Sequence, residues 1–91
     1  MRIQVTREDV DNRDMGRGYL SHCVVANAIR RTTSKDVKVY LSCMDFDGFF
    51  WDLPPNVGAF ITNIYLNKWI PADDELIEFN LEDCVRGTKL D

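Results

Sequence analysis

The chain has 91 residues, of which 45% are hydrophobic, 29% charged and 11% aromatic. This length accommodates one domain, and this composition is typical of a folded protein rather than a disordered one. No apolar run approaches the roughly 20 residues that span a bilayer, and the N-terminus lacks the apolar core of a signal peptide. We therefore expect a single domain over residues 1–91, located in the cytosol and not bound to a membrane.

The formal net charge of −4 is unevenly distributed along the chain. Residues 1–44 carry a net charge of +3, whereas residues 45–91 carry −7. Nonspecific nucleic-acid binding depends on the neutralisation of phosphates, so we expect no direct nucleic-acid binding by this acidic protein. The difference in sign favours a local anion site in the first half and self-association between unlike faces, unless folding disperses the charges.

In chain order, the first predicted element is a short strand over residues 2–6, because apolar residues alternate there. Thr6 can cap the turn that follows, and Asp9 stands three residues later as a weaker form of the capping-box acid. Gly16 and Gly18 then indicate a loop.

The next predicted element is an amphipathic helix of about ten residues, with Ser21 as its N-cap. Arg30 and Arg31 close this helix, where cations complement the helix dipole. His22 and Cys23 lie near its start, where the dipole can lower the pKa of a thiol. His22 is the one histidine of the chain, so no second histidine completes a catalytic relay, and we interpret Cys23 as a buried structural residue.

The three cysteines are odd in number and widely separated. Because the sequence has no CxxC spacing, we predict reduced thiols, no metal site and no cofactor. With no paired nucleophile and base, no metal set and no phosphate loop, we do not expect an enzyme.

A β-hairpin is predicted from a strand over residues 37–43 and a second strand over residues 49–53. A two-residue Asp47–Gly48 turn would place the apolar positions of these two strands on opposite sides of the hairpin. A three-residue loop, Phe46-Asp47-Gly48, places them on the same side. We therefore predict the three-residue loop, with Gly48 as the left-handed residue of a type I turn followed by a bulge.

The second half begins with a helix that starts at Pro54–Pro55 and ends near Asn67 or Lys68. A last strand is predicted over residues 76–81, and the tail after Glu82 is predicted to be loose. The order β-α-β-β-α-β predicts an α+β fold, with an antiparallel sheet of about four strands and two helices on one face.

Two short motifs in the first third resemble a family of small uncharacterised proteins from phage and bacterial genomes. That family opens with Thr-x-x-Asp-Ile/Val and continues with a Cys-Pro-Val/Ile-Ala-x-Ala-Leu/Ile-Arg-Arg helix. Val24 stands where the family often has proline. The resemblance implies a small accessory protein of phage-like origin and implies no particular activity. The matching residues are Thr6, Asp9, Val10, Cys23, Val25, Ala26, Ala28, Ile29, Arg30 and Arg31, with Leu53–Pro54 and Glu78–Phe79 further along the chain.

The basic residues of the first half are the best candidates for a ligand site. Arginines beside glycine-rich backbone can bind phosphate or carboxylate in a bidentate manner. Helix capping and solvation would explain the same charges without a ligand. The predicted ligand-binding residues are Arg13, Arg17, Arg30, Arg31 and Lys35.

Two further groups of side chains have alternative interpretations. Asp73, Asp74 and Glu75 form an acidic run that is either a solvated loop or a contact for a protein partner. The aromatic residues are numerous for so small a chain, and they fit core packing, a subunit interface or the stacking of a ligand. The rings in question are Phe46, Phe49, Phe50, Trp51, Tyr65 and Trp69.

These observations support two non-enzymatic functions. The first is a phage-type immune-evasion protein that forms a small homo-oligomer and sequesters a charged, nucleotide-like signal. In that case, replacing Arg30 or Arg31 by alanine abolishes ligand binding without unfolding the protein. The alternative is a protein-binding inhibitor of a host defence protein, of the acidic nucleic-acid-mimic type such as an anti-CRISPR, or a homo-oligomeric accessory protein with no ligand.

Overall fold

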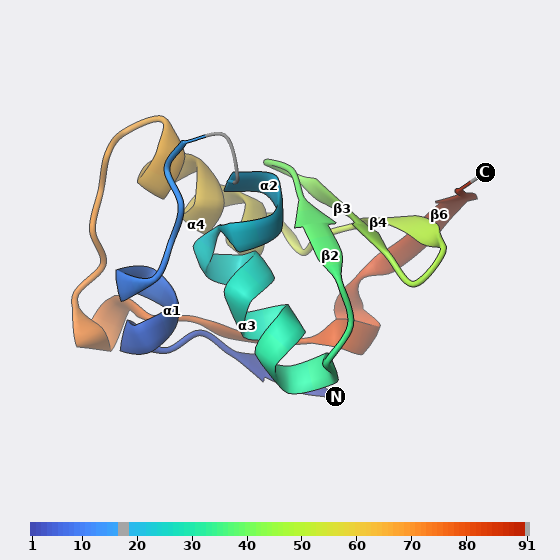
Figure 1. Ribbon diagram of the computed structural model, residues 1–91, viewed down its shortest axis with the longest axis horizontal. Coiled ribbons are helices and arrows are strands. Elements are labelled where there is room, and N and C mark those ends of the chain that lie inside the picture. Colours follow the sequence, from blue (N-terminus) through green and yellow to red (C-terminus); the bar gives the residue numbers. More distant parts are fainter. Residues whose placement is uncertain (17–18, 91) are drawn as a thin grey trace.

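The computed structural model describes residues 1–16 and 19–90, with residues 19 and 20 described by their backbone alone (Figure 1). Its helices and two antiparallel sheets confirm the predicted α+β class. No helix in these ranges is long and apolar enough to cross a bilayer. The elements are β1 (Arg2–Gln4), α1 (Arg7–Asp11), α2 (Tyr19–His22), α3 (Val24–Thr33), β2 (Val37–Val39), β3 (Cys43–Phe46), β4 (Phe49–Asp52), α4 (Pro55–Tyr65), the 3₁₀ turn η1 (Asp73–Glu75), β5 (Glu78–Asn80), the 3₁₀ turn η2 (Leu81–Asp83) and β6 (Val85–Lys89).

The strands are divided between two sheets, whereas the sequence predicted one sheet of about four strands. β1 pairs with β5 in a two-stranded sheet, with Arg2 opposite Asn80. The other sheet has four strands in the order β2-β3-β4-β6. Helix α3 contacts both β1 and β2, so it lies between the two sheets and joins them (Figure 1). The four-stranded sheet therefore extends to one side of the helices, and its β4–β6 end lies furthest from them.

The predicted strand over residues 37–43 is interrupted by a turn at residues 40–42, which divides it into β2 and β3. The backbone N–H of Tyr40 donates to the carbonyl of Cys43 across this turn (2.8 Å). The turn changes which positions face the core, because Val37 and Val39 are buried before it, whereas Met44 and Phe46 are buried after it.

Because the buried positions change from odd to even residue numbers at this turn, the prediction of a three-residue hairpin loop is wrong. Phe46 lies opposite Phe49, so β3 and β4 are joined by the two-residue turn Asp47–Gly48. Both turn residues have positive φ, 52° and 87°, as a type I′ turn requires. With this register Met44 lies opposite Trp51, and the apolar sets share one face.

The tail after Glu82, predicted to be loose, contains strand β6. This strand pairs antiparallel with β4, and Arg86 lies opposite Trp51. All five residues of β6 are exposed, so the strand has no buried alternation that a sequence pattern could reveal.

Both predicted long helices are present, with corrected ends. The N-cap of α3 is Cys23 and not Ser21, because the Cys23 Sγ accepts a hydrogen bond from the Ala26 N–H (3.3 Å). This helix continues past the two arginines to Thr33. Helix α4 begins beside Pro54 as predicted and ends at Tyr65, before the predicted end. Its buried residues are Val57, Phe60, Ile61 and Ile64.

Candidate functional site

The residues of the Thr-x-x-Asp motif form a polar network where α1 meets α3, which we call the α1–α3 junction. Asp9 is only 3% exposed, and its Oδ2 accepts a hydrogen bond from the Thr6 backbone N–H (2.9 Å). The Thr6 hydroxyl in turn accepts from the Asp9 N–H, which completes the predicted capping box. Arg31 forms an ion pair with the same Oδ2 (2.9 Å) and donates to the carbonyl of Gln4 (2.8 Å). Hydrogen bonding to Asp9 raises the pKa of Arg31.

Arg30 is held in the same region by different partners. Its guanidinium donates to the backbone carbonyl of Ser21 and to the side-chain oxygen of Asn27 (2.8 Å). The Asn27 amide also donates to the carbonyl of Asp9 (3.1 Å). Both arginines at the end of the motif therefore connect α3 to preceding segments of the chain.

The structure does not bring the five predicted ligand-binding cations together at one described pocket. Arg13 donates to the carbonyl of Val10 (2.7 Å), and Arg17 lies outside the described residues. Arg30 and Lys35 line different pockets. Anion binding by these side chains stays a prediction, but the structural partners of Arg30 and Arg31 account for both guanidinium groups.

The acidic run forms the short turn η1 and has partners within the chain. Asp73 forms an ion pair with Arg7 (2.8 Å). The Glu75 carboxylate accepts from the backbone N–H of Ala72 (2.9 Å) and so caps its own turn. Asp74 is exposed. A protein contact through this run stays a prediction.

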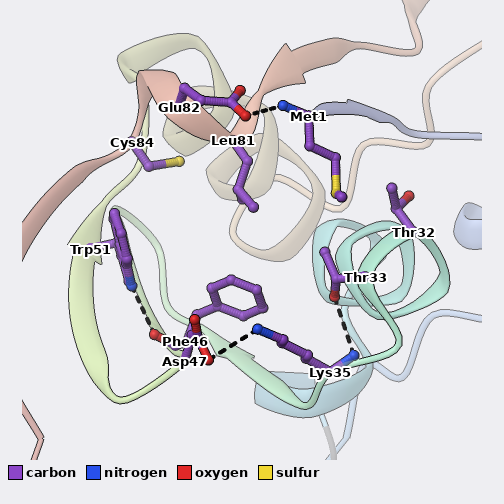
Figure 2. Close-up of a pocket in the computed structure, with 10 residues that line it drawn as sticks. All are labelled: Met1, Thr32, Thr33, Lys35, Phe46, Asp47, Trp51, Leu81, Glu82 and Cys84. Atoms are coloured by element: carbon purple, nitrogen blue, oxygen red, sulfur yellow. Dashed lines mark hydrogen bonds and ion pairs between the residues drawn. The ribbon is translucent and has the colours of Figure 1, made fainter.

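A pocket of about 470 Å³ opens between the end of α3, the β3–β4 hairpin and η2, and we call it the hairpin pocket (Figure 2). The side chains of Phe46 and Leu81 point into the space between Trp51 and α3. Its ten lining residues are Met1, Thr32, Thr33, Lys35, Phe46, Asp47, Trp51, Leu81, Glu82 and Cys84.

Aromatic and charged side chains meet in this pocket. The Trp51 indole N–H donates to the carbonyl of Phe46 (2.7 Å), which fixes the orientation of the indole ring. The Lys35 Nζ lies 6.0 Å from the centroid of the Phe46 ring and 3.1 Å from the carboxylate of Asp47. The pocket therefore combines an aromatic wall with a cation and a hydrogen-bond acceptor.

The thiol in the pocket wall is not an activated nucleophile. Burial raises the pKa of Cys84 to about 11, and the nearby charges of Asp83 and Glu82 act in the same direction. Burial likewise raises the pKa of the Cys23 thiol to about 11. Both thiols are therefore protonated near pH 7. In the described part of the chain, no three His, Cys, Asp or Glu residues are placed to hold a metal ion.

Sequence reasoning identified Lys35 as a site residue and treated Phe46 and Trp51 as possible stacking rings, but it did not combine them. Leu81 was predicted as part of the last strand and Cys84 as a reduced thiol, and neither was predicted to belong to a site. No protein-family model, no curated protein and no solved structure matches this chain significantly. The interpretation of the site therefore depends on its own geometry.

Proposed function

We propose that this protein is a non-enzymatic binding protein that holds a planar, nucleotide-like small molecule in the hairpin pocket. The observation that carries the proposal is that Trp51, Phe46 and Lys35 line one open pocket. Its volume of about 470 Å³ lies in the range typical of small-molecule sites, and such sites combine apolar walls with a few polar groups.

The charges of the pocket favour a particular kind of ligand. A flat ring can pack against Trp51, while Lys35, whose ion pair with Asp47 is exposed and therefore weak, can attract an anionic group such as phosphate. The carboxylates of Asp47 and Glu82 also line the pocket and can accept hydrogen bonds from the N–H groups of a heterocycle. The same carboxylates repel a polyphosphate, so a nucleotide with few charges fits better than a triphosphate.

The phage-like resemblance of residues 6–31 supports a biological role for such binding. A small protein that binds a nucleotide-like signal without altering it lowers the free concentration of that signal by mass action. We therefore propose immune evasion by sequestration in the host cytosol. The alternative of an acidic protein-binding inhibitor has less support, because Asp73 and Glu75 already have partners within the chain.

Tryptophan fluorescence tests the proposal, because one tryptophan lies in the pocket and the other lies elsewhere. Trp69 packs edge-to-face on Phe60 (5.6 Å between centroids) and does not line the pocket. In a Trp69→Phe variant, titration with the four common nucleoside 5′-monophosphates should give a saturable change in Trp51 emission for at least one of them. The matched Trp51→Phe variant should give none.

Lysine variants provide the second arm of this experiment. Lys35→Ala should weaken nucleotide binding roughly tenfold, since a charge-assisted hydrogen bond contributes about 1.5 kcal/mol or more. Lys38→Ala is the control, because Lys38 is exposed and lies outside the pocket. Absence of a saturable signal with all four nucleotides, or equal effects of the two lysine variants, would contradict the proposal.

A further inference from the structure

A line of aromatic and basic side chains continues from the hairpin pocket along the β4–β6 end of the sheet. Directly paired residues of antiparallel strands lie on the same face, so Arg86 shares the face of Trp51, and Lys89 shares the face of Phe49. The Phe49 ring stands edge-to-face to Trp51, with 6.3 Å between centroids. The Arg86 guanidinium lies 4.8 Å from the centroid of the Phe49 ring.

Arg86 differs from the other described arginines in that its side chain forms no hydrogen bond or ion pair with another described residue. Arg2 and Arg7 form ion pairs with carboxylates, and Arg31 does the same. Arg13 and Arg30 donate to backbone carbonyls. Within residues 1–16 and 19–90, no carboxylate or carbonyl accepts a hydrogen bond from Arg86, whose contact is with a ring.

The position of Arg86 over the Phe49 ring suits a phosphate. A guanidinium that stacks on a ring keeps its N–H edge free, and this planar edge matches two phosphate oxygens. The residue is exposed, so a ligand can reach it without displacing any other side chain. The stacking on Phe49 restricts the guanidinium in advance and so reduces the entropy cost of binding.

The charge pattern separates the two ends of this line. Asp47 and Glu82 lie in the hairpin pocket, whereas Arg86 and Lys89 lie on the β6 side of Trp51. Lys35 also lines the pocket and can attract one phosphate there. A second phosphate of the ligand lowers its electrostatic energy by extending toward β6, away from Asp47 and Glu82.

We propose that the ligand of this site is a dinucleotide, with one base against Trp51 in the hairpin pocket and a phosphate bound by Arg86. This inference depends on the proposed function and specifies its ligand class. A long single strand fits less well, because the net charge of the protein is −4 and the described cations on this face are few.

Affinity measured as a function of ligand length tests this inference. The Trp69→Phe protein is titrated with a mononucleotide, the corresponding 5′-phosphorylated dinucleotide and a hexanucleotide, again through Trp51 fluorescence. We expect the dinucleotide to bind at least tenfold more tightly than the mononucleotide, and the hexanucleotide to bind no more tightly than the dinucleotide. Arg86→Ala should remove most of the dinucleotide advantage, because it should weaken dinucleotide binding far more than mononucleotide binding.

Two matched variants control for general effects of charge and folding. Arg2→Ala removes an exposed arginine of the other sheet and should leave the dinucleotide advantage intact. Arg86→Gln provides a second substitution with a longer side chain in case the alanine variant does not fold. Retention of the dinucleotide advantage in a folded Arg86 variant would overturn the assignment.

The remaining outcomes separate this inference from the proposed function. Equal affinities for the mononucleotide and the dinucleotide would overturn the inference and leave the proposed function standing. An affinity that keeps rising up to the hexanucleotide would overturn it in favour of a single-stranded polymer. Absence of any binding would overturn both.

Discussion

The α1–α3 junction and the face of β4 and β6 that carries Phe49, Trp51 and Arg86, which we call the aromatic face, both contain arginines. They use these arginines in opposite ways. At the junction, Arg31 forms an ion pair with Asp9, whose side chain is almost fully buried. On the aromatic face, Arg86 is exposed and contacts the ring of Phe49. Arg31, which belongs to the motif at the end of α3, has its hydrogen-bond partners inside the chain. The side chain of Arg86, in a segment that was predicted to be loose, forms no hydrogen bond with another described residue.

This difference shows how a charged motif can be structural. A buried carboxylate requires a cation and several hydrogen-bond donors, so residues far apart in the sequence must be kept together. Asp9 obtains these from Thr6 and Arg31. A binding site has the opposite requirement, because its polar groups must remain available to the ligand.

The largest expected effect comes from breaking the junction at its buried carboxylate. Asp9→Ala should lower the free energy of unfolding by about 3 kcal/mol, since it removes the hydrogen bonds that Thr6 and Arg31 make to a buried carboxylate and one half of a capping box. Urea denaturation at pH 7 measures this loss. Asp11→Ala is the matched control, because Asp11 is an exposed carboxylate on the same helix. Equal midpoints for the two variants would contradict the structural assignment of the motif.

An intermediate effect is expected from alkaline pH, through the buried thiols of Cys23 at the start of α3 and Cys84 in the hairpin pocket. Burial raises the pKa of Cys23 and of Cys84 from 9.0 to about 11. The thiols of the unfolded chain release their protons first, so stability should be complete below pH 9 and should fall as the pH rises toward 11.

Thermal or urea unfolding at a series of pH values between 8 and 11 measures this decrease. Cys84→Ala should make the decrease less steep, because it removes one of the two buried thiols. This thiol is the cleaner choice, since the Cys23 sulfur also caps α3. Burial also raises the pKa of Tyr65, whose phenol adds to the decrease above pH 10 in all variants. If stability falls with pH equally steeply in Cys84→Ala and in the unmodified protein, the pKa of the Cys84 thiol is the same in the folded and unfolded states.

The smallest effects on stability are expected at the hairpin pocket and on the aromatic face. Lys35 and its partner Asp47 have side chains that are 55% and 56% exposed, and exposed ion pairs contribute at most about 1 kcal/mol. Lys35→Ala and Arg86→Ala should therefore each change the free energy of unfolding by less than about 1 kcal/mol. Urea denaturation of both variants, measured together with Asp9→Ala, compares the three losses in the free energy of unfolding. A loss in either variant equal to that of Asp9→Ala would contradict the difference between the two regions.

The sequence predicted the fold where periodicity was strong. The apolar positions of α4 recur at helical spacing, and Thr6 and Asp9 have the spacing of a capping box, so both features were identified. The hairpin register failed because the turn at residues 40–42 contains no glycine or proline. Apolar and polar residues alternate through this turn, so residues 37–43 were predicted as one strand.

The candidate site was harder to predict, for a physical reason. Strand β6 pairs through its backbone, and its side chains are all exposed, so composition does not distinguish it from a disordered tail. Lys35 was identified as a cation. Its pairing with the wall formed by Phe46 and Trp51 depends on the true hairpin register and on the path of the segment after residue 80.

The pairing of β1 with β5 has a consequence for the order in which the molecule folds. During synthesis, Asp9 and Arg31 can meet as soon as α3 has left the ribosome, because 22 residues separate them. Strand β1 has to wait until residue 80 has been made, since Arg2 lies opposite Asn80. We therefore expect a native-like α1–α3 unit to form early, while the backbone edge of β1 stays unpaired until residues 78–80 have been made. This nonlocal pairing should slow a late step of folding.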